Sequence, residues 1–308
     1  MAYFLLALSM SLVGSYVALS KPLVAALPVF LLAWLRFGVG ILAMPHWLKT
    51  PQDELPMTTN TKKLVFLESF FGNFLFTVCM LYGIGLTSAV SAGVIMASIP
   101  AVIAVMSWFF LGEKINRRIV MGIACVALGT LLFTISNTAL FLHSDLKSAS
   151  IQTYAYAFWG NLLIFGAVVC EATYAVIGKK LTASLSPKRI TALINLWGFA
   201  LMTPMGLYVA WTFEFASVAF NIWLLLIFYA LAASVGSVWL WMTGLKSIPA
   251  AKAGVFTVML PISTASVGVL YLDETLSLLQ CVAFGICLLG VVMATHSGSE
   301  ATEEIKGD

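Results

Sequence analysis

Three ionisable side chains fall inside long apolar runs of this 308-residue chain: Glu171, Glu68 and Arg36. A charge at the centre of a membrane helix costs about 2.5–3.5 kcal/mol on insertion scales, so such residues usually pair or serve a function. Glu171 lies two turns before Lys179, about 12 Å deep at 1.5 Å per residue. It could carry a proton or act as a counter-charge for an amine; a hydrogen-bonded structural acid is the alternative. Glu68 and Arg36 are candidates for coupling or gating. The structural alternative is an ion pair with a nearby lysine for Glu68 and a pair across helices for Arg36.

Neutral side chains in the same runs could line a solute cavity. Asn73 and Asn195 supply donors and acceptors at depth, although interhelical hydrogen bonds use the same groups. Tyr16 and Tyr174 occupy equivalent positions of the first and sixth apolar runs, which predicts that both hydroxyls face a shared cavity. Trp239 could face this cavity too, with anchoring at the membrane interface as its alternative.

Patterns typical of enzymes are missing from the sequence. His46, His143 and His296 lie in loops or at the ends of apolar runs, and neither a nucleophile elbow nor a phosphate-binding loop occurs. All five cysteines fall in apolar runs without a C-x-x-C spacing. We therefore predict no catalytic residues, no metal and no other cofactor. The scattered basic residues predict no nucleic-acid partner.

Composition indicates what positions these side chains. The chain is 61% hydrophobic and 9% charged, with a mean hydropathy of +1.01, unlike a soluble domain. Its apolar runs, of roughly 17–25 residues, are long enough to cross the membrane as helices. Ten spans are predicted: Ala2–Leu19, Pro28–Leu48, Leu64–Ile84, Ser91–Leu111, Ile119–Ser136, Ala155–Gly178, Ile190–Trp211, Ile222–Thr243, Ala253–Leu272 and Leu276–Thr295.

An internal repeat relates the two halves of the chain. The segment Ser91–Thr134 recurs, without a gap, as Lys252–Thr295. Each copy contains five predicted spans, and this odd number inverts the second copy relative to the first. We predict an all-α polytopic membrane protein of ten transmembrane helices in two inverted five-helix repeats. The predicted parts are residues 1–136, an external linker 137–154, residues 155–295 and an acidic cytoplasmic tail 296–308.

Repeated single residues suggest how the two copies work. Pro100 and Pro261 are predicted to lie inside the fourth and ninth helices, where paired kinks would give each half a bending point for gating. Glu113 and Glu274 close those helices, and each carboxylate is expected to meet the amides at the start of the following helix. Glycines are expected to make smooth packing faces in the fifth and tenth helices: Gly122, Gly129, Gly285 and Gly290.

Charge distribution predicts the orientation. If the N-terminus is cytoplasmic, most of the sixteen lysines and arginines fall in cytoplasmic loops and the tail. We therefore predict a multi-pass protein of the inner (cytoplasmic) membrane with both termini in the cytoplasm.

These features together resemble the EamA family of the drug/metabolite transporter superfamily over essentially the whole chain. The resemblance is carried by V-G-S-Y-V-A-L-S-K in the first span, S-I-P-A-V-I-A around Pro100 with Leu111-Gly112-Glu113 after it, T-Y-A-V-I-G-K-K in the sixth span, and Leu272-Asp273-Glu274. It implies transport of a small metabolite, often export of amino acids or related compounds. Glu171 stands where an aromatic residue is common in that family.

The sequence thus predicts a secondary transporter that moves a small organic metabolite by alternating access, with export implied by the resemblance. An amino acid or an amphipathic compound suits the few deep charges better than a phosphate. The alternative is a channel-like or scramblase-type membrane protein without coupled transport. Predicted partners are the solute, membrane lipid and a coupling proton, and the protein is expected to be a monomer or a homodimer.

Overall fold

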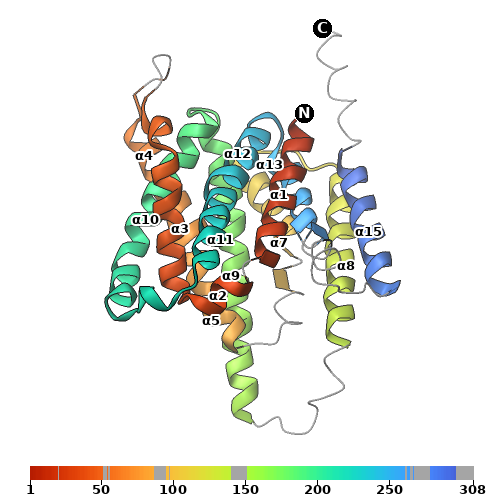
Figure 1. Ribbon diagram of the computed structural model, residues 1–308. Helices are drawn as coiled ribbons and strands as arrows, with labels where there is room; N and C mark the ends of the chain where they lie inside the picture. The colour runs from red at the N-terminus through yellow and green to blue at the C-terminus, as the bar shows by residue number, and fades with distance from the viewer. Residues whose placement is uncertain are drawn as a thin grey trace. The chain divides into compact units, whose positions relative to one another are not determined.

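The computed structural model describes residues 1–19, 21–50, 54, 56–86, 95–96, 98–139, 151–260, 262–263, 266 and 278–295. Every regular element within these ranges is a helix (Figure 1). In chain order they are α1 (Ala2–Leu19), α2 (Lys21–Ala26), α3 (Val29–Ala43), η1 (Pro45–Leu48), α4 (Thr59–Ser69), η2 (Phe70–Leu75), α5 (Phe76–Leu86), α7 (Ile99–Leu111), α8 (Arg117–Ala139), α9 (Ile151–Leu181), α10 (Pro187–Thr212), η3 (Phe215–Ser217), α11 (Phe220–Ala230), η4 (Leu231–Gly236), α12 (Ser237–Ser247), α13 (Ala250–Val255), η5 (Phe256–Val258) and α15 (Leu278–Thr295).

Four helices in the described ranges are long and apolar enough to cross a membrane: Thr59–Met80, Phe158–Leu181, Pro187–Thr212 and Phe220–Ser247. Shorter apolar helices of 10–17 residues are Ala2–Ser15, Val29–Ala43, Ile99–Leu111 and Cys281–Met293. A polytopic helical membrane protein, the coarse form of the sequence prediction, accounts for this pattern. Two short elements lie between predicted spans and were not predicted: α2 and η3.

The chain folds into two compact units, each of which takes segments from both predicted repeats. Unit 1 comprises Met1–Leu75, Ile177–Ile248 and Met259–Glu274; unit 2 comprises Phe76–Val176, Pro249–Val258 and Thr275–Asp308. The boundaries of these units follow packing, whereas the boundaries of a repeat follow sequence similarity. The two divisions of the chain therefore need not coincide.

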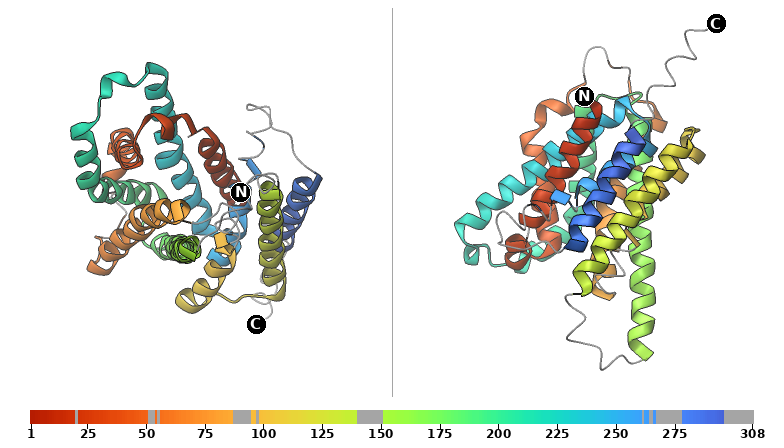
Figure 2. Two further views of the ribbon diagram at one scale, coloured as in Figure 1. Left: turned by 90° about the horizontal axis from the view of Figure 1, so that it is seen from below. Right: turned by 90° about the vertical axis from the view of Figure 1, so that its right-hand side faces the viewer.

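In unit 1, α10 packs closely against α3 (Figures 1 and 2). Glycines allow this approach, because a Cβ built on Gly198 would lie 3.0 Å from the Phe37 ring and one on Gly206 would meet Trp34. The Trp34 indole N–H also donates to the Thr203 hydroxyl over 3.1 Å. The position of α10 against α3 is thus set by close backbone contact as well as by apolar packing.

In unit 2, α8 and α15 run side by side in all three views (Figures 1 and 2). A Cβ on Gly290 would lie 2.7 Å from the carbonyl oxygen of Gly122, and one on Gly129 would overlap the Cys287 sulfur. Three of the four predicted packing glycines therefore lie in this contact. Gly285 is exposed and has nothing within 4 Å of its built Cβ.

Gly129→Ala is expected to destabilise the α8–α15 pair by about 1–3 kcal/mol, the usual cost of overpacking. The added methyl group would overlap the Cys287 sulfur and would lie 2.8 Å from the backbone oxygen of Ala283, which a side-chain rotation cannot move away. Gly285→Ala is the matched control, because the same change on the same helix pair meets open space. Thermal unfolding in detergent measures both. Equal melting temperatures for the two variants would show that the glycine contact does not limit stability.

The structure corrects the predicted place of Pro100. A turn at Ser98 precedes α7, so Pro100 lies in the first turn of that helix and not in its interior. Proline suits this position, because the first helical N–H groups have no intrahelical acceptor. In the second copy, regular helix gives way at Phe256–Val258 to the 3₁₀ turn η5, shortly before Pro261, which lies outside the described residues. Both helices are thus interrupted ahead of the proline.

Candidate functional site

Two π-helical segments interrupt otherwise regular membrane helices at matching positions. η2 (Phe70–Leu75) lies between α4 and α5, and η4 (Leu231–Gly236) lies between α11 and α12. Both ends of η4 follow those of η2 by the same offset in the chain that separates the two copies of the sequence repeat. Single-turn π-segments inside α-helices frequently mark functional sites. This pair therefore identifies the part of unit 1 where a site is best sought.

The first π-segment and the helical turn before it are hydrogen-bonded to α10 through two polar side chains. The hydroxyl of Ser69, which is fully buried, donates to the carbonyl oxygen of Ile194 over 2.8 Å. The Asn73 amide donates to the same oxygen over 3.2 Å and to the Ser69 hydroxyl over 3.3 Å. One carbonyl of α10 thus accepts from two neighbouring turns of the α4–η2 helix.

The second π-segment is hydrogen-bonded to the next residue of α10. The Asn195 amide nitrogen donates to the carbonyl oxygen of Ser234 in η4 over 2.8 Å and to that of Thr191 over 2.7 Å. Asn195 is only 1% exposed. Helix α3 approaches the same point at Gly40, where a Cβ would lie 2.8 Å from that of Ser234. Ile194 and Asn195 therefore connect α10 to both π-segments.

This cluster keeps unused hydrogen-bonding capacity. Among the described residues, neither the side-chain oxygen of Asn195 nor the hydroxyl of Ser234 has a hydrogen-bond partner, although both atoms are buried. An unsatisfied buried polar group costs about 1–3 kcal/mol. Such groups are usually explained by strain, function or a bound molecule. Together with the π-segments, they give a polar centre in an apolar unit.

Glu68 lies one residue before Ser69 and is 0% exposed. Neither of its carboxylate oxygens has a hydrogen-bond or ion-pair partner in the described part of the chain. The structure therefore does not contain the ion pair with a nearby lysine that served as its structural alternative. A Cβ built on Gly178 would lie 2.7 Å from Glu68 Oε1 and 3.1 Å from Met242 Cε. The acid and the Met242 thioether therefore border the same glycine position.

Arg36 and Trp239 also belong to unit 1. The Arg36 guanidinium lies 4.3 Å from the centroid of the adjacent Phe37 ring, and its buried Nε has no hydrogen-bond partner within the described ranges. The interhelical ion pair considered for Arg36 is not seen there. Trp239 packs its ring 6.1 Å from that of Trp47, over which the Lys188 ammonium lies at 5.9 Å. Such an aromatic–cation group is typical of an interface anchor.

Two predicted cavity residues, Glu171 and Tyr174, belong to unit 2. Both are half-buried on α9, and no hydrogen bond or ion pair of Glu171 occurs with the residues that the structure describes. Tyr16 lies in α1, with its side chain outside the described set. Of the predicted site residues, the structure therefore brings Asn73 and Asn195 together, because Asn73 donates to the carbonyl of Ile194, the residue before Asn195. Glu68 lies one turn before Asn73 in the chain.

Sequence reasoning missed Ser69, Ser234 and Gly40. The repeat contained the signal for one of them, because Ser234 occupies the position in the second copy that Asn73 occupies in the first. Ser69 lies one helical turn before Asn73, a spacing that places both side chains on one face. Gly40 becomes informative only when its neighbours are known.

Glu113 shows a different contact from the predicted one. Its two carboxylate oxygens accept from the backbone N–H groups of Ala250 and Ala251, over 2.8 and 3.1 Å, at the start of α13. The following helix, α8, is instead capped by Asn116, whose side-chain oxygen accepts from Ile119 N over 2.9 Å. The contact holds together parts of unit 2 that come from both predicted repeats.

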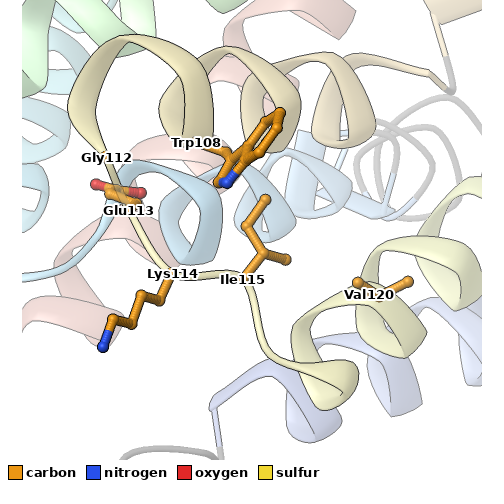
Figure 3. A pocket seen from close by; sticks show the side chains of 6 residues that line it. All are labelled: Trp108, Gly112, Glu113, Lys114, Ile115 and Val120. Carbon is orange, nitrogen blue, oxygen red and sulfur yellow. The ribbon is translucent and has the colours of Figure 1, made fainter.

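A shallow hollow of about 450 Å³ borders this turn (Figure 3). It is lined by Trp108, Gly112, Glu113, Lys114, Ile115 and Val120. Lys114 extends away from Trp108 (Figure 3). A second hollow lies along α4 and is lined by Thr59, Lys62, Lys63, Phe66 and Leu67. None of the predicted cavity residues borders either one, so neither hollow marks the predicted solute site. The described residues contain no group of three or more His, Cys, Asp and Glu that could hold a metal ion.

Comparison with protein families gives one match over two stretches of the chain. The model described as the EamA-like transporter family matches residues 1–135 and 158–295. These stretches correspond closely to the two predicted repeats.

Two relatives from Bacillus subtilis (strain 168) bear names of the same kind. The chain is 30% identical to the uncharacterized transporter YetK over 295 residues, which cover 96% of this chain and 86% of YetK. It is 25% identical to the uncharacterized transporter YyaM over 270 residues, which cover 85% and 83% of the two chains. A protein of known crystal structure is similar in fold, with a TM-score of 0.72 at 19% identity, over 94% of this chain and 95% of that one.

Proposed function

Because the chain belongs to the EamA-like transporter family, a family of membrane transporters and not of enzymes, we propose that it exports a small organic metabolite by alternating access. The solute site would be formed by the polar residues around Ile194 and Asn195 on α10. The observation that carries this assignment is a pair of hydrogen bonds between α10 and the π-segments: Asn73 in η2 donates to the Ile194 carbonyl, and Asn195 donates to the Ser234 carbonyl in η4.

The proposed architecture is ten helices in two inverted five-helix repeats, with the boundaries predicted from the sequence. Three observations support it. The family model matches twice; the π-segments recur at the offset of the sequence repeat; and regular helix is interrupted shortly before each repeated proline. In transporters built this way, solute sites lie at interrupted helices near the midplane.

The chemistry of the site favours an amino acid or an amphipathic metabolite. Asn195 and Ser234 offer neutral oxygen atoms without partners among the described residues, and the guanidinium Nε of Arg36 is a buried cationic donor in the same unit. A solute with one carboxylate and one amine would match such groups. A multiply charged phosphate would require several cations at this depth.

A transport screen tests the proposal. Purified protein in proteoliposomes is loaded with a metabolite extract, and the solutes that leave the vesicles are identified by mass spectrometry. We expect saturable release of a small set of amino-acid-like compounds. Unselective ion conductance, or movement of fluorescent lipid between leaflets, would instead identify a channel or a scramblase.

We place the protein in the inner (cytoplasmic) membrane, with both termini in the cytoplasm. Glu214→Cys, in the turn after α10, should then react with a membrane-impermeant maleimide added to intact cells. Ser184→Cys, in the turn before α10, should react only after the cells are opened. The parent protein, whose cysteines lie in apolar runs, is the labelling control. External labelling at position 184 would contradict this orientation.

A further inference from the structure

We propose that Glu68 is the proton-binding residue of this transporter and that its proton is exchanged during transport. The coupling part of this inference rests on the proposed transport function. The proton-binding part rests on the surroundings of one side chain in unit 1.

Burial of Glu68 is complete. Its side chain is 0% exposed, and neither carboxylate oxygen meets a donor or a cation in the part of the chain that the structure describes. Its Oε1 lies beside the Gly178 position, which the thioether of Met242 also borders. An isolated ionised carboxylate in apolar surroundings costs far more than a neutral acid does. The geometry is therefore that of an acid which holds its proton.

The basic groups on the elements around Glu68 are engaged elsewhere or exposed. On α9, the Lys179 ammonium donates to the carbonyl oxygens of Leu245 and Lys246, over 2.9 and 3.2 Å. On α10, the Arg189 guanidinium lies 2.9 Å from Glu54. The remaining lysines on these elements have exposed side chains: Lys62 and Lys63 on α4, Lys180 on α9, Lys188 on α10 and Lys246 on α12.

The place of Glu68 in the helix connects proton binding to the solute site. Glu68 directly precedes Ser69, which donates to the Ile194 carbonyl, and it lies two residues before η2. A π-segment carries one residue more than a regular helix does, and moving that residue along the chain would rotate the preceding turn by about 100°. Such a change would alter the surroundings of Glu68 and the contacts of Ser69 together.

Glu171, the other deep acid, has a less enclosed side chain. It is half-buried, whereas Glu68 is inaccessible. Glu171→Gln is therefore a matched control: the same substitution, also in a membrane span, at a carboxylate whose side chain is less completely covered.

Infrared difference spectroscopy tests proton binding without a solute. Wild-type protein in lipid nanodiscs is stepped between neutral and alkaline pH, and the carbonyl stretch of protonated carboxylic acids is recorded. We expect a band at neutral pH that is lost in Glu68→Gln, shifted in Glu68→Asp and retained in Glu171→Gln. Thermal unfolding of each variant shows that it is folded. A spectrum of Glu68→Gln that retains the wild-type band would overturn the proposal.

Coupling is tested in proteoliposomes with a radiolabelled mixture of the proteinogenic amino acids as the probe. An imposed pH gradient should accelerate uptake by the wild type but not by Glu68→Gln, which should retain solute exchange at equal pH. Acceleration of Glu68→Gln to the wild-type extent would contradict the coupling role. If no amino acid is transported at all, the proposed solute class is wrong, and the infrared result still decides whether Glu68 binds a proton.

Discussion

Arg189→Met is expected to lower the free energy of unfolding by about 3–5 kcal/mol, because it leaves Glu54 buried without its counter-charge. The two side chains are each 7% exposed, with 2.9 Å between Arg189 Nε and Glu54 Oε1. The N–H bond is not aimed at this oxygen, so the contact is an ion pair and not an aligned hydrogen bond. A second guanidinium nitrogen donates to the Leu48 carbonyl over 3.4 Å, which connects the start of α10 to η1.

The matched control for this prediction is the double variant Glu54→Leu/Arg189→Met. Replacing both partners of a buried ion pair by apolar residues is often nearly neutral, so most of the lost stability should return. Thermal unfolding and the yield of folded protein in detergent measure the series. If the single and double variants lost equal stability, the interaction between Glu54 and Arg189 would contribute little to the free energy of unfolding.

Asn195→Asp is expected to lower transport turnover by about tenfold, equivalent to about 1.4 kcal/mol in the barrier. The side chain keeps its shape but loses the N–H groups that donate to the carbonyl oxygens of Thr191 and Ser234. An added carboxylate oxygen would face those same carbonyls. Turnover is measured in proteoliposomes and divided by the amount of folded protein, so that a loss of yield is not counted as a loss of rate.

Asn73→Ala provides the comparison for Asn195→Asp. Asn73 donates a hydrogen bond to Ile194 of α10, and Asn195 of α10 donates one to Ser234 of η4. When Asn73 is removed, the Ile194 carbonyl keeps a second donor, the Ser69 hydroxyl. A smaller loss of turnover is therefore expected. If Asn195→Asp kept wild-type turnover while Asn73→Ala lost most of it, the order of the two effects would be reversed. The contact of Asn195 with η4 would then not be the one on which transport depends.

The sequence predicted several elements of the fold closely. The first span, Ala2–Leu19, coincides with α1, and the predicted run Ile119–Ser136 lies within α8. Hydrophobic length alone suffices for such helices. The sequence also singled out Asn73, Asn195 and Glu68, because polar residues stand out in apolar runs.

The hydrogen-bond partners of side chains and the local helix geometry could not be predicted in the same way. Hydropathy does not distinguish π-helical from α-helical turns, so η2 and η4 lay hidden inside two predicted spans. Pro100 was placed within a helix because the apolar run continues through it, whereas Ser98 begins a new one. Glu113 was assigned to the helix next in sequence, yet it contacts α13, which lies in the other half of the chain. The duplication showed that Glu113 has a role but not which amides it meets.

The most direct test of the central claim is solute counterflow in proteoliposomes. Vesicles loaded with an unlabelled solute from the screen are diluted into a trace of the same solute in radiolabelled form. Because alternating access exchanges solutes through one site, we predict a transient accumulation of label in wild-type vesicles that saturates with solute concentration. The rate of accumulation should fall about tenfold in Asn195→Asp, which alters the proposed site on α10. Label that only equilibrates, without overshoot or saturation, would contradict carrier transport by this chain.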